Sequence, residues 1–144
     1  MKYLIPTLSV ILSTGCTSVQ VKQLEPSLNV TKICIEENEK VIVPQFLNIV
    51  RSGLSRHGIE SEVYQQNTPS PCDINLTYTA TQKWDFVLFM TDAELWLNNK
   101  SGQQVGYAQY HLIGGGGFDF SKWASPESKM NPVIDKLLLG YQSK

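Results

Sequence analysis

After its first fifteen residues, the sequence lacks any run of apolar residues that could cross a membrane. A spanning helix needs about 20 consecutive apolar residues, and a later run such as residues 87–90 is far shorter. Basic charge is also scarce, because 12 Lys and Arg stand against 13 Asp and Glu and form no cluster. Since nucleic acid is bound by concentrated positive charge, these absences exclude a membrane-spanning domain and a nucleic-acid partner.

The motifs of common catalytic and cofactor sites are lacking too. The glycine run at residues 114–117 is followed by no Gly-Lys-Ser/Thr and opens no Gly-x-Gly-x-x-Gly helix, so it does not predict a phosphate-binding loop. No serine or cysteine stands in a recognisable nucleophile elbow, and no Cys-x-x-Cys pair is present. We therefore expect no cofactor, no metal site and no enzymatic activity.

The most informative segment that is present lies at the amino terminus. An apolar stretch at residues 4–12 follows Lys2 and precedes Ser13-Thr14-Gly15-Cys16. A short apolar segment before a small-residue cleavage site is typical of a secretory signal, and the small-small-Gly-Cys run resembles the signal of bacterial lipoproteins, although Ser13 stands where they usually have Leu. The resemblance implies that Cys16 is the lipidated first residue of the mature protein. An ordinary signal peptide with an incidental cysteine is the alternative.

Lipidation at Cys16 would anchor the domain to a bilayer without spanning it, because each buried CH₂ of an acyl chain contributes about 0.8 kcal/mol. In Gram-negative lipoproteins an Asp after the cysteine favours the inner membrane, so by analogy Thr17 favours the outer membrane, with the domain facing the periplasm. We expect a signal peptide at residues 1–15, a flexible tether at 16–29 and a single domain at 30–144. The tether prediction rests on polar composition, Pro26 and the absence of a period.

Two further cysteines, Cys34 and Cys72, are predicted to form a disulfide. The lipoprotein resemblance places them in an oxidising compartment, where a pair without a Cys-x-x-Cys motif or a nearby His is more often bridged than bound to metal. Two free thiols buried as small apolar groups are the alternative.

Hydrophobic periodicity predicts two helices. One spans residues 44–57, with Pro44 in the first turn and Gly58 as a cap, and its apolar stripe consists of Val43, Phe46, Leu47, Val50 and Leu54. The second is predicted over residues 132–139, after two capping signals, Ser125-Pro126 and Asn131-Pro132.

Alternation at a spacing of two predicts strands over residues 30–36, 59–65, 74–84, 86–97 and 103–112. The last three are expected to form a meander. The elements are expected in the order β-α-β-β-β-α, as a two-layer α+β fold in which a curved, mostly antiparallel sheet carries both helices on one face.

Three parts of the chain resemble small lipoproteins of Gram-negative bacteria. They are residues 33–38, residues 78–80 with Trp84-Asp85, and residues 108–112 leading through the glycine run into Lys122-Trp123. The architecture is also similar to periplasmic lipoprotein subunits that plug or brace outer-membrane assemblies. The resemblance covers most of the mature chain and implies a location, but a fold-level analogy implies no activity.

The segment at residues 114–123 is the predicted contact with a partner. Phe118, Phe120 and Trp123 crowd one side of it, and aromatic residues dominate binding hot spots. The alternative is that Phe118 and Phe120 fold back over the core, because Phe-Asp-Phe alternates as in a strand. Trp96 is a further candidate contact, and we expect it to be more accessible than Trp84.

The two histidines have different interpretations. His57 lies at the end of the first predicted helix, where a cation complements the helix dipole. His111 lies near a strand end, with Asp119 and Asp85 as possible carboxylate partners for general-base chemistry.

We interpret the chain as a non-enzymatic outer-membrane lipoprotein that binds or braces another envelope component, with an envelope protein of unknown identity as the expected partner. One alternative is an inhibitor of an incoming lytic enzyme, which would expose a rigid loop. The other is a small envelope hydrolase using His111, which would need a concave pocket.

Overall fold

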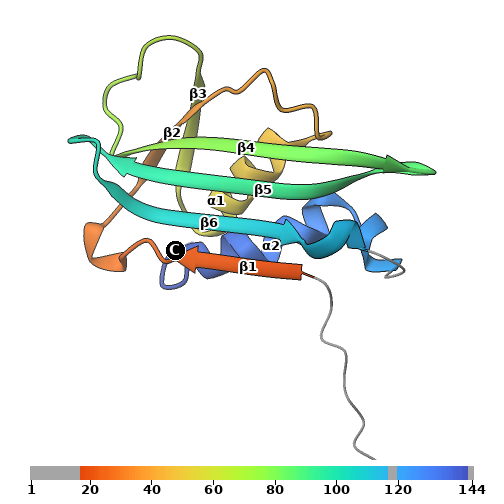
Figure 1. The fold of residues 1–144 in the computed structure, drawn as a ribbon. Helices are drawn as coiled ribbons and strands as arrows, with labels where there is room; N and C mark the ends of the chain where they lie inside the picture. The colour runs from red at the N-terminus through yellow and green to blue at the C-terminus, as the bar shows by residue number, and fades with distance from the viewer. Residues whose placement is uncertain (1–16, 117–119, 143–144) are drawn as a thin grey trace, which may run out of the picture.

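The computed structural model describes residues 17–116 and 120–142. They form a six-stranded sheet with two α-helices on one of its faces, so the predicted two-layer α+β fold is confirmed (Figure 1). The predicted signal peptide and Cys16 lie outside the described residues. Within these residues, none of the helices combines the length and the apolar character that a membrane span needs.

The sheet has the strand order β1-β6-β5-β4-β2-β3. Its strands are β1 (Thr17–Lys22), β2 (Lys32–Glu36), β3 (Glu60–Tyr64), β4 (Ile74–Asp85), β5 (Val87–Asn99) and β6 (Gln104–Leu112). The other elements are α1 (Phe46–Arg56), α2 (Pro126–Leu137) and the short 3₁₀ helices η1 (Pro26–Leu28), η2 (Ile113–Gly116) and η3 (Phe120–Trp123). Pairing is antiparallel from β1 through β4 and parallel where β2 joins β4 and β3.

The predicted tether is wrong. Residues 17–22 form β1, an edge strand that pairs with β6 along its whole length, from Thr17 opposite Leu112 to Lys22 opposite Tyr107. Leu24 is fully buried, and its N–H donates to the carbonyl of Leu137. The folded domain therefore includes the chain from Thr17 onward.

The order of strands and α-helices is β-β-α-β-β-β-β-α, which has two strands more than the predicted order. One is β1, which falls in the predicted tether. The second difference is a miscount in the predicted order, which contains four strands although five strand ranges are predicted. Those five ranges each coincide with a strand to within a few residues at either end.

The core lies between the sheet and the helix layer. Alternate residues of β4, namely Ile74, Leu76, Tyr78 and Ala80, are buried and face the helices. The two helices meet at Gly53 of α1, where a Cβ would lie only 2.6 Å from Cγ2 of Ile134 in α2. Glycine is therefore required for this close approach, because a larger residue would push the helices apart.

Helix α2 begins at Pro126, earlier than the predicted start at Pro132. The first of the two capping signals forms the cap, since Oγ of Ser125 accepts a hydrogen bond from the N–H of Ser128 at 3.1 Å. Pro132 lies exposed inside the helix, where it loses one backbone hydrogen bond. Helix α1 begins slightly later than predicted and ends before Gly58, whose positive φ of 71° suits the predicted cap.

The predicted disulfide between Cys34 and Cys72 is confirmed. Cys34 belongs to β2, and Cys72 lies just before β4, the strand beside it, with 5.9 Å between the two Cα atoms. The bridge closes a loop with a sequence separation of 38 that contains α1 and β3. It thus ties the parallel part of the sheet to its antiparallel part.

We expect the double variant Cys34→Ala, Cys72→Ala to lose about 4 kcal/mol of unfolding free energy, because the open loop has more conformational freedom in the unfolded chain. Denaturant unfolding of the oxidised protein, the reduced protein and the double variant measures this loss. Reductant should destabilise the wild type and leave the double variant unchanged. Equal stability of oxidised wild type and double variant would contradict a stabilising role for the bridge.

Candidate binding site

The hairpin formed by β4 and β5 extends past its neighbours in the sheet. Strand β6 ends at Leu112, opposite the start of β1 at Thr17, whereas β4 and β5 stay paired as far as Asp85 and Val87. The hairpin residues between Thr91 and the turn have no part of β6 beside them. The hairpin therefore projects about five residues, or roughly 17 Å, beyond the end of the sheet at which β1 begins (Figure 1).

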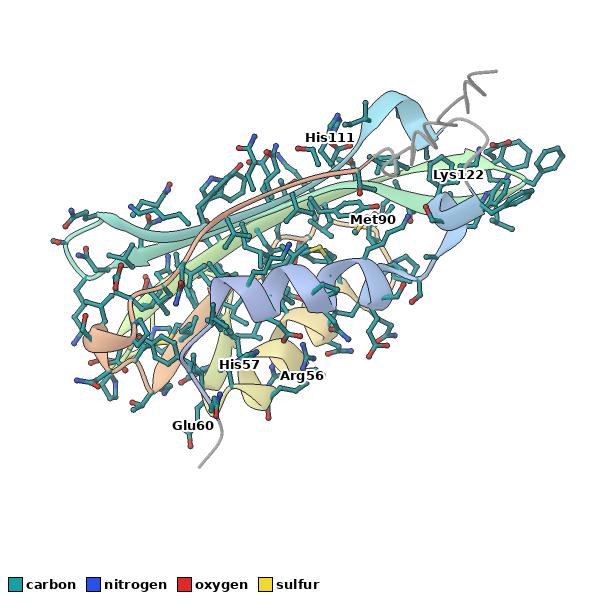
Figure 2. All side chains as sticks on the ribbon, turned by 90° about the horizontal axis from the view of Figure 1, so that it is seen from below. Arg56, His57, Glu60, Met90, His111 and Lys122 are labelled. Carbon is teal, nitrogen blue, oxygen red and sulfur yellow. A yellow bond between two sulfur atoms is a disulfide. The ribbon has the colours of Figure 1, made fainter. Side chains whose placement is uncertain are left out.

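Large apolar side chains are exposed at the end of this projection. Four of the ten exposed large apolar residues of the described chain lie around the turn of the hairpin, namely Trp84, Phe86, Val87 and Leu88. Phe120 of η3 is also exposed, and its ring centroid lies 5.8 Å from that of Trp123, which donates to Asp85. We call these five residues the hairpin tip. Phe86 is 83% exposed and Trp84 is 71% exposed, with 6.4 Å between their ring centroids. Figure 2 shows aromatic rings at this end of the molecule, beyond the labelled Lys122. Such a cluster of exposed apolar groups is typical of a binding surface.

An ion pair between a buried lysine and a partly exposed aspartate supports the hairpin tip. Lys122 of η3 is only 6% exposed, and its Nζ lies 2.6 Å from Oδ2 of Asp85 at the end of β4. Nε1 of Trp123 donates to the backbone carbonyl of Asp85 at 3.1 Å. Nearby, the ammonium of Lys129 in α2 donates to the carbonyl of Met90 at 3.0 Å, and burial lowers the pKa of Lys129. These contacts hold the hairpin against η3 and α2, so the hairpin tip is positioned by the fold.

The backbone at the hairpin tip adopts a conformation that its sequence does not favour. Phe86 has a φ of 63°, in the left-handed region that glycine and asparagine adopt more easily than an aromatic residue. A backbone conformation that the residue type disfavours, when it occurs at an exposed position, is a common sign of a functional site. Stability alone therefore does not explain an aromatic residue at position 86.

The predicted contact residues lie in different environments. Phe120 is 82% exposed, so the alternative in which it folds back over the core is wrong. Trp123 is partly buried against the core, and Phe118 lies outside the described residues.

The predicted order of accessibility for Trp84 and Trp96 is wrong. Trp96 is half-buried because it lies on the open face of the sheet beside Tyr107, with 6.1 Å between the ring centroids. Trp84 lies beyond the ends of the neighbouring strands and is exposed. Three further exposed residues, Phe86, Val87 and Leu88, were not predicted as contacts. The signal that marks them is the run of consecutive apolar residues directly after Asp85, which breaks the strand alternation.

The open face of the sheet, on the side away from the helices, is polar. The Tyr107 hydroxyl donates to Oε2 of Glu94 at 2.8 Å, and burial, followed by this hydrogen bond and the charge of Glu94, raises the pKa of Tyr107 to about 12. Burial alone would raise the pKa of Asp92, but hydrogen bonds from His111 and Thr91 outweigh burial, so the pKa of this carboxyl lies below its usual range. The open face thus carries paired polar groups around Trp96 and Tyr107.

His111 pairs with a carboxylate other than the two suggested by the sequence. Its Nδ1 is hydrogen-bonded to Asp92, whereas Asp85 pairs with Lys122, and Asp119 lies outside the described residues. Ser18 is opposite His111 in the register, but no side-chain hydrogen bond joins them in the described chain.

His57 caps α1, as predicted, and also joins it to the end of the described chain. It is the C-cap residue of the helix, with Nδ1 2.6 Å from the carbonyl of Tyr141 and Nε2 2.8 Å from Oδ1 of Asp135. Across residues 17–116 and 120–142, no group of three His, Cys, Asp or Glu side chains is arranged to hold a metal ion.

Comparisons with known proteins identify the fold. No protein-family model matches the chain, and no curated protein does. Among solved structures, the chain is similar to the PelC dodecamer from Paraburkholderia phytofirmans, with 12% identity over 88% of this chain and 99% of that chain and a TM-score of 0.56. A variant PelC dodecamer from the same organism matches with 14% identity over 89% and 98% of the two chains, again with a TM-score of 0.56. At such identities the likeness shows a shared fold.

We expect Phe86→Asn to unfold at the same or a higher temperature than the wild type. Asparagine tolerates the left-handed region, where a bulky residue is disfavoured by about 1 kcal/mol, and the exposed ring contributes little packing. The buried Phe89 of the same hairpin is the matched control, and Phe89→Asn should cost at least about 3 kcal/mol. Thermal unfolding of both variants tests this expectation. A comparable fall in the unfolding temperature of both variants would mean that Phe86 supports the fold.

Proposed function

We propose that this chain is a non-enzymatic outer-membrane lipoprotein, facing the periplasm, that lies against the membrane through its hairpin tip and binds or braces another envelope component. The observation that carries the proposal is the position of the hairpin tip. Five exposed apolar side chains lie beyond the end of the sheet where β1 begins, and the predicted lipidation site Cys16 directly precedes the first residue of β1 in the sequence.

The lipid anchor and the hairpin tip would face the same bilayer. Cys16 directly precedes Thr17, so acyl chains on Cys16 would enter the membrane at this end of the sheet. Tryptophan and phenylalanine suit the boundary between headgroups and acyl chains, because their rings bury large apolar areas. A second membrane contact would also fix how the domain is oriented, which a flexible lipid anchor alone does not do.

The inhibitor alternative has weaker support, although the projecting hairpin is the kind of exposed loop that it requires. Asp85, the one carboxylate at the turn of this hairpin, is paired with Lys122, and most of the exposed side chains around it are apolar. The hydrolase alternative is also less supported, since His111 lies exposed on the open face of the sheet and its hydrogen bond among the described residues is to Asp92, with no serine or cysteine nucleophile.

The rest of the domain is free to bind the envelope component. The fold is shared with PelC proteins described as dodecamers, and by this likeness we propose that the chain works in an assembly. The open face around Trp96 and Tyr107 is the proposed protein-binding surface, because aromatic side chains with satisfied polar neighbours are typical of interfaces.

Cys16→Ser is expected to release the protein from the outer membrane, because the lipid contributes most of the binding energy. Fractionation of cells expressing the wild type and the variant measures this. Thr17→Ser, which leaves the cysteine intact, is the matched control and should stay membrane-bound. Unchanged sedimentation of Cys16→Ser with the outer membrane would contradict the lipoprotein assignment.

Trp84 is expected to be quenched by lipids brominated near the headgroups when the lipidated protein is reconstituted in vesicles of phosphatidylethanolamine and phosphatidylglycerol. The test uses a protein with Trp84 as its single tryptophan, made by Trp96→Phe and Trp123→Phe. The matched control retains Trp96 alone, on the open face, and should not be quenched. Equal fluorescence of the Trp84 protein in brominated and plain vesicles would overturn the proposed membrane contact.

A further inference from the structure

We propose that copies of this chain assemble side by side on the membrane, with β1 of one copy pairing antiparallel with β3 of the next. The inference rests on the proposed function, which places every copy on one membrane surface with its hairpin tip toward the bilayer. It adds a defined partner, a second copy of the chain, and a defined pair of edges.

The sheet has two open edges. Within the described residues, β1 pairs only with β6, and β3 pairs only with β2. Strand β1 is six residues long, contains no proline and carries no charge before Lys22, so it lacks the usual protections against strand addition. Val19 on this edge is partly exposed.

The outer edge of β3 offers backbone groups for pairing. The N–H of Glu60 donates to Thr31, and the carbonyl of Tyr64 accepts from Glu37, so both residues bond toward the β2 side. Because alternate residues of a strand bond to opposite sides, Ser61 and Val63 direct their N–H and C=O groups outward. They are the groups that a new strand would meet.

Strand direction decides which edges can pair. Strand β1 runs away from the hairpin tip, since it begins at that end, whereas β4 runs toward it and ends there at Asp85. Strands β2 and β3 are parallel to β4, so β3 also runs toward the tip. When neighbouring copies have their tips on the same membrane, β1 of one and β3 of the next are therefore antiparallel.

Pairing of β1 with β1 of a second copy does not meet these conditions. An antiparallel β1–β1 pair would direct the two hairpin tips in opposite directions. A parallel β1–β1 pair, related by a twofold axis along the strands, would put the helices of the two copies on opposite faces of the joined sheet. The contact between β1 and β3, in contrast, directs both hairpin tips toward the same membrane and leaves both helix layers on the same face of the joined sheet.

One register matches the side chains of both strands. Val19 and Val21 lie on the helix face, opposite Tyr110 and Ala108 in the ladder with β6, and Val63 shares this face through its pairing with Ile35. With Val19 opposite Val63 of the next copy, each of the five residues of β3 has a partner residue in β1.

The same register is favourable on the open face. It sets Lys22 opposite Glu60 of the next copy and Gln20 opposite Glu62. Opposite charges facing each other across a strand pair stabilise it.

The contact joins two different edges, so it is heterologous and continues from copy to copy. A heterologous contact generates a ring when its rotation closes and a filament when it does not. Because every hairpin tip faces the membrane, the rotation axis is expected to lie along the membrane normal.

Disulfide cross-linking in isolated outer membranes tests the pairing. The full-length double variant Gln20→Cys, Glu62→Cys places the new thiols opposite each other across the interface, and mild oxidation should give a ladder of dimers, trimers and larger species. The single variants Gln20→Cys and Glu62→Cys are the matched controls and should remain monomeric. A dimer formed by Gln20→Cys alone would overturn the proposal in favour of β1–β1 pairing.

A charge exchange tests the register without new cysteines. Lys22→Glu should reduce the fraction of the protein that migrates as large species in native gels of solubilised membranes, and Lys22→Glu with Glu60→Lys should restore it. No reduction in the single variant, or no restoration in the double variant, would contradict the register. Circular dichroism of each variant confirms that the domain remains folded.

The outcomes separate this inference from the proposed function. A double cysteine variant that sediments with the outer membrane but gives no ladder overturns the edge pairing alone. Loss of the unaltered full-length protein from the membrane fraction overturns the proposed function on which the pairing rests.

Discussion

The pairing of β4 with β5 is the interaction on which the rest of the structure depends. Over the centre of the sheet, it presents one row of apolar residues to the helices and one row of polar residues to the open face. Past the end of β6 the same ladder continues without a neighbour, and apolar side chains there remain exposed. The ion pair between Lys122 and Asp85 fixes this projecting part to the domain.

Features that lower stability are concentrated in the hairpin tip and its support. Exposed aromatic rings, a phenylalanine with positive φ and buried lysine side chains all occur there. Single departures also occur elsewhere, such as the positive φ of Gln45 and Pro132 inside α2, but no buried side-chain nitrogen or oxygen atom of the described chain lacks a hydrogen-bond partner. Natural proteins depart from local rules mainly at functional sites, and this tendency supports the proposal that the hairpin tip is a contact surface.

Elements with a strong hydrophobic period could be predicted from the sequence. Features that depend on how the strands pair in the sheet could not. Helix α1 and the meander follow directly from apolar spacing. Strand β1 was missed because polar residues and Pro26 surround it, although Val19 and Val21 alternate at the strand period. The exposure of Trp84 depends on where β6 ends, which is a property of the paired sheet and leaves no mark in the sequence around Trp84.

The proposed function requires the hairpin tip to lie in the membrane surface, and spin labels measure this most directly. A label at Val87→Cys would lie in the hairpin tip, and one at Ser101→Cys would lie in the loop between β5 and β6, at the other end of the sheet. In vesicles holding the lipidated protein, we expect the label at position 87 to collide with oxygen and to be shielded from a water-soluble nickel complex, whereas the label at position 101 should collide with the nickel complex. Equal access of the nickel complex to both labels would contradict the proposed membrane contact.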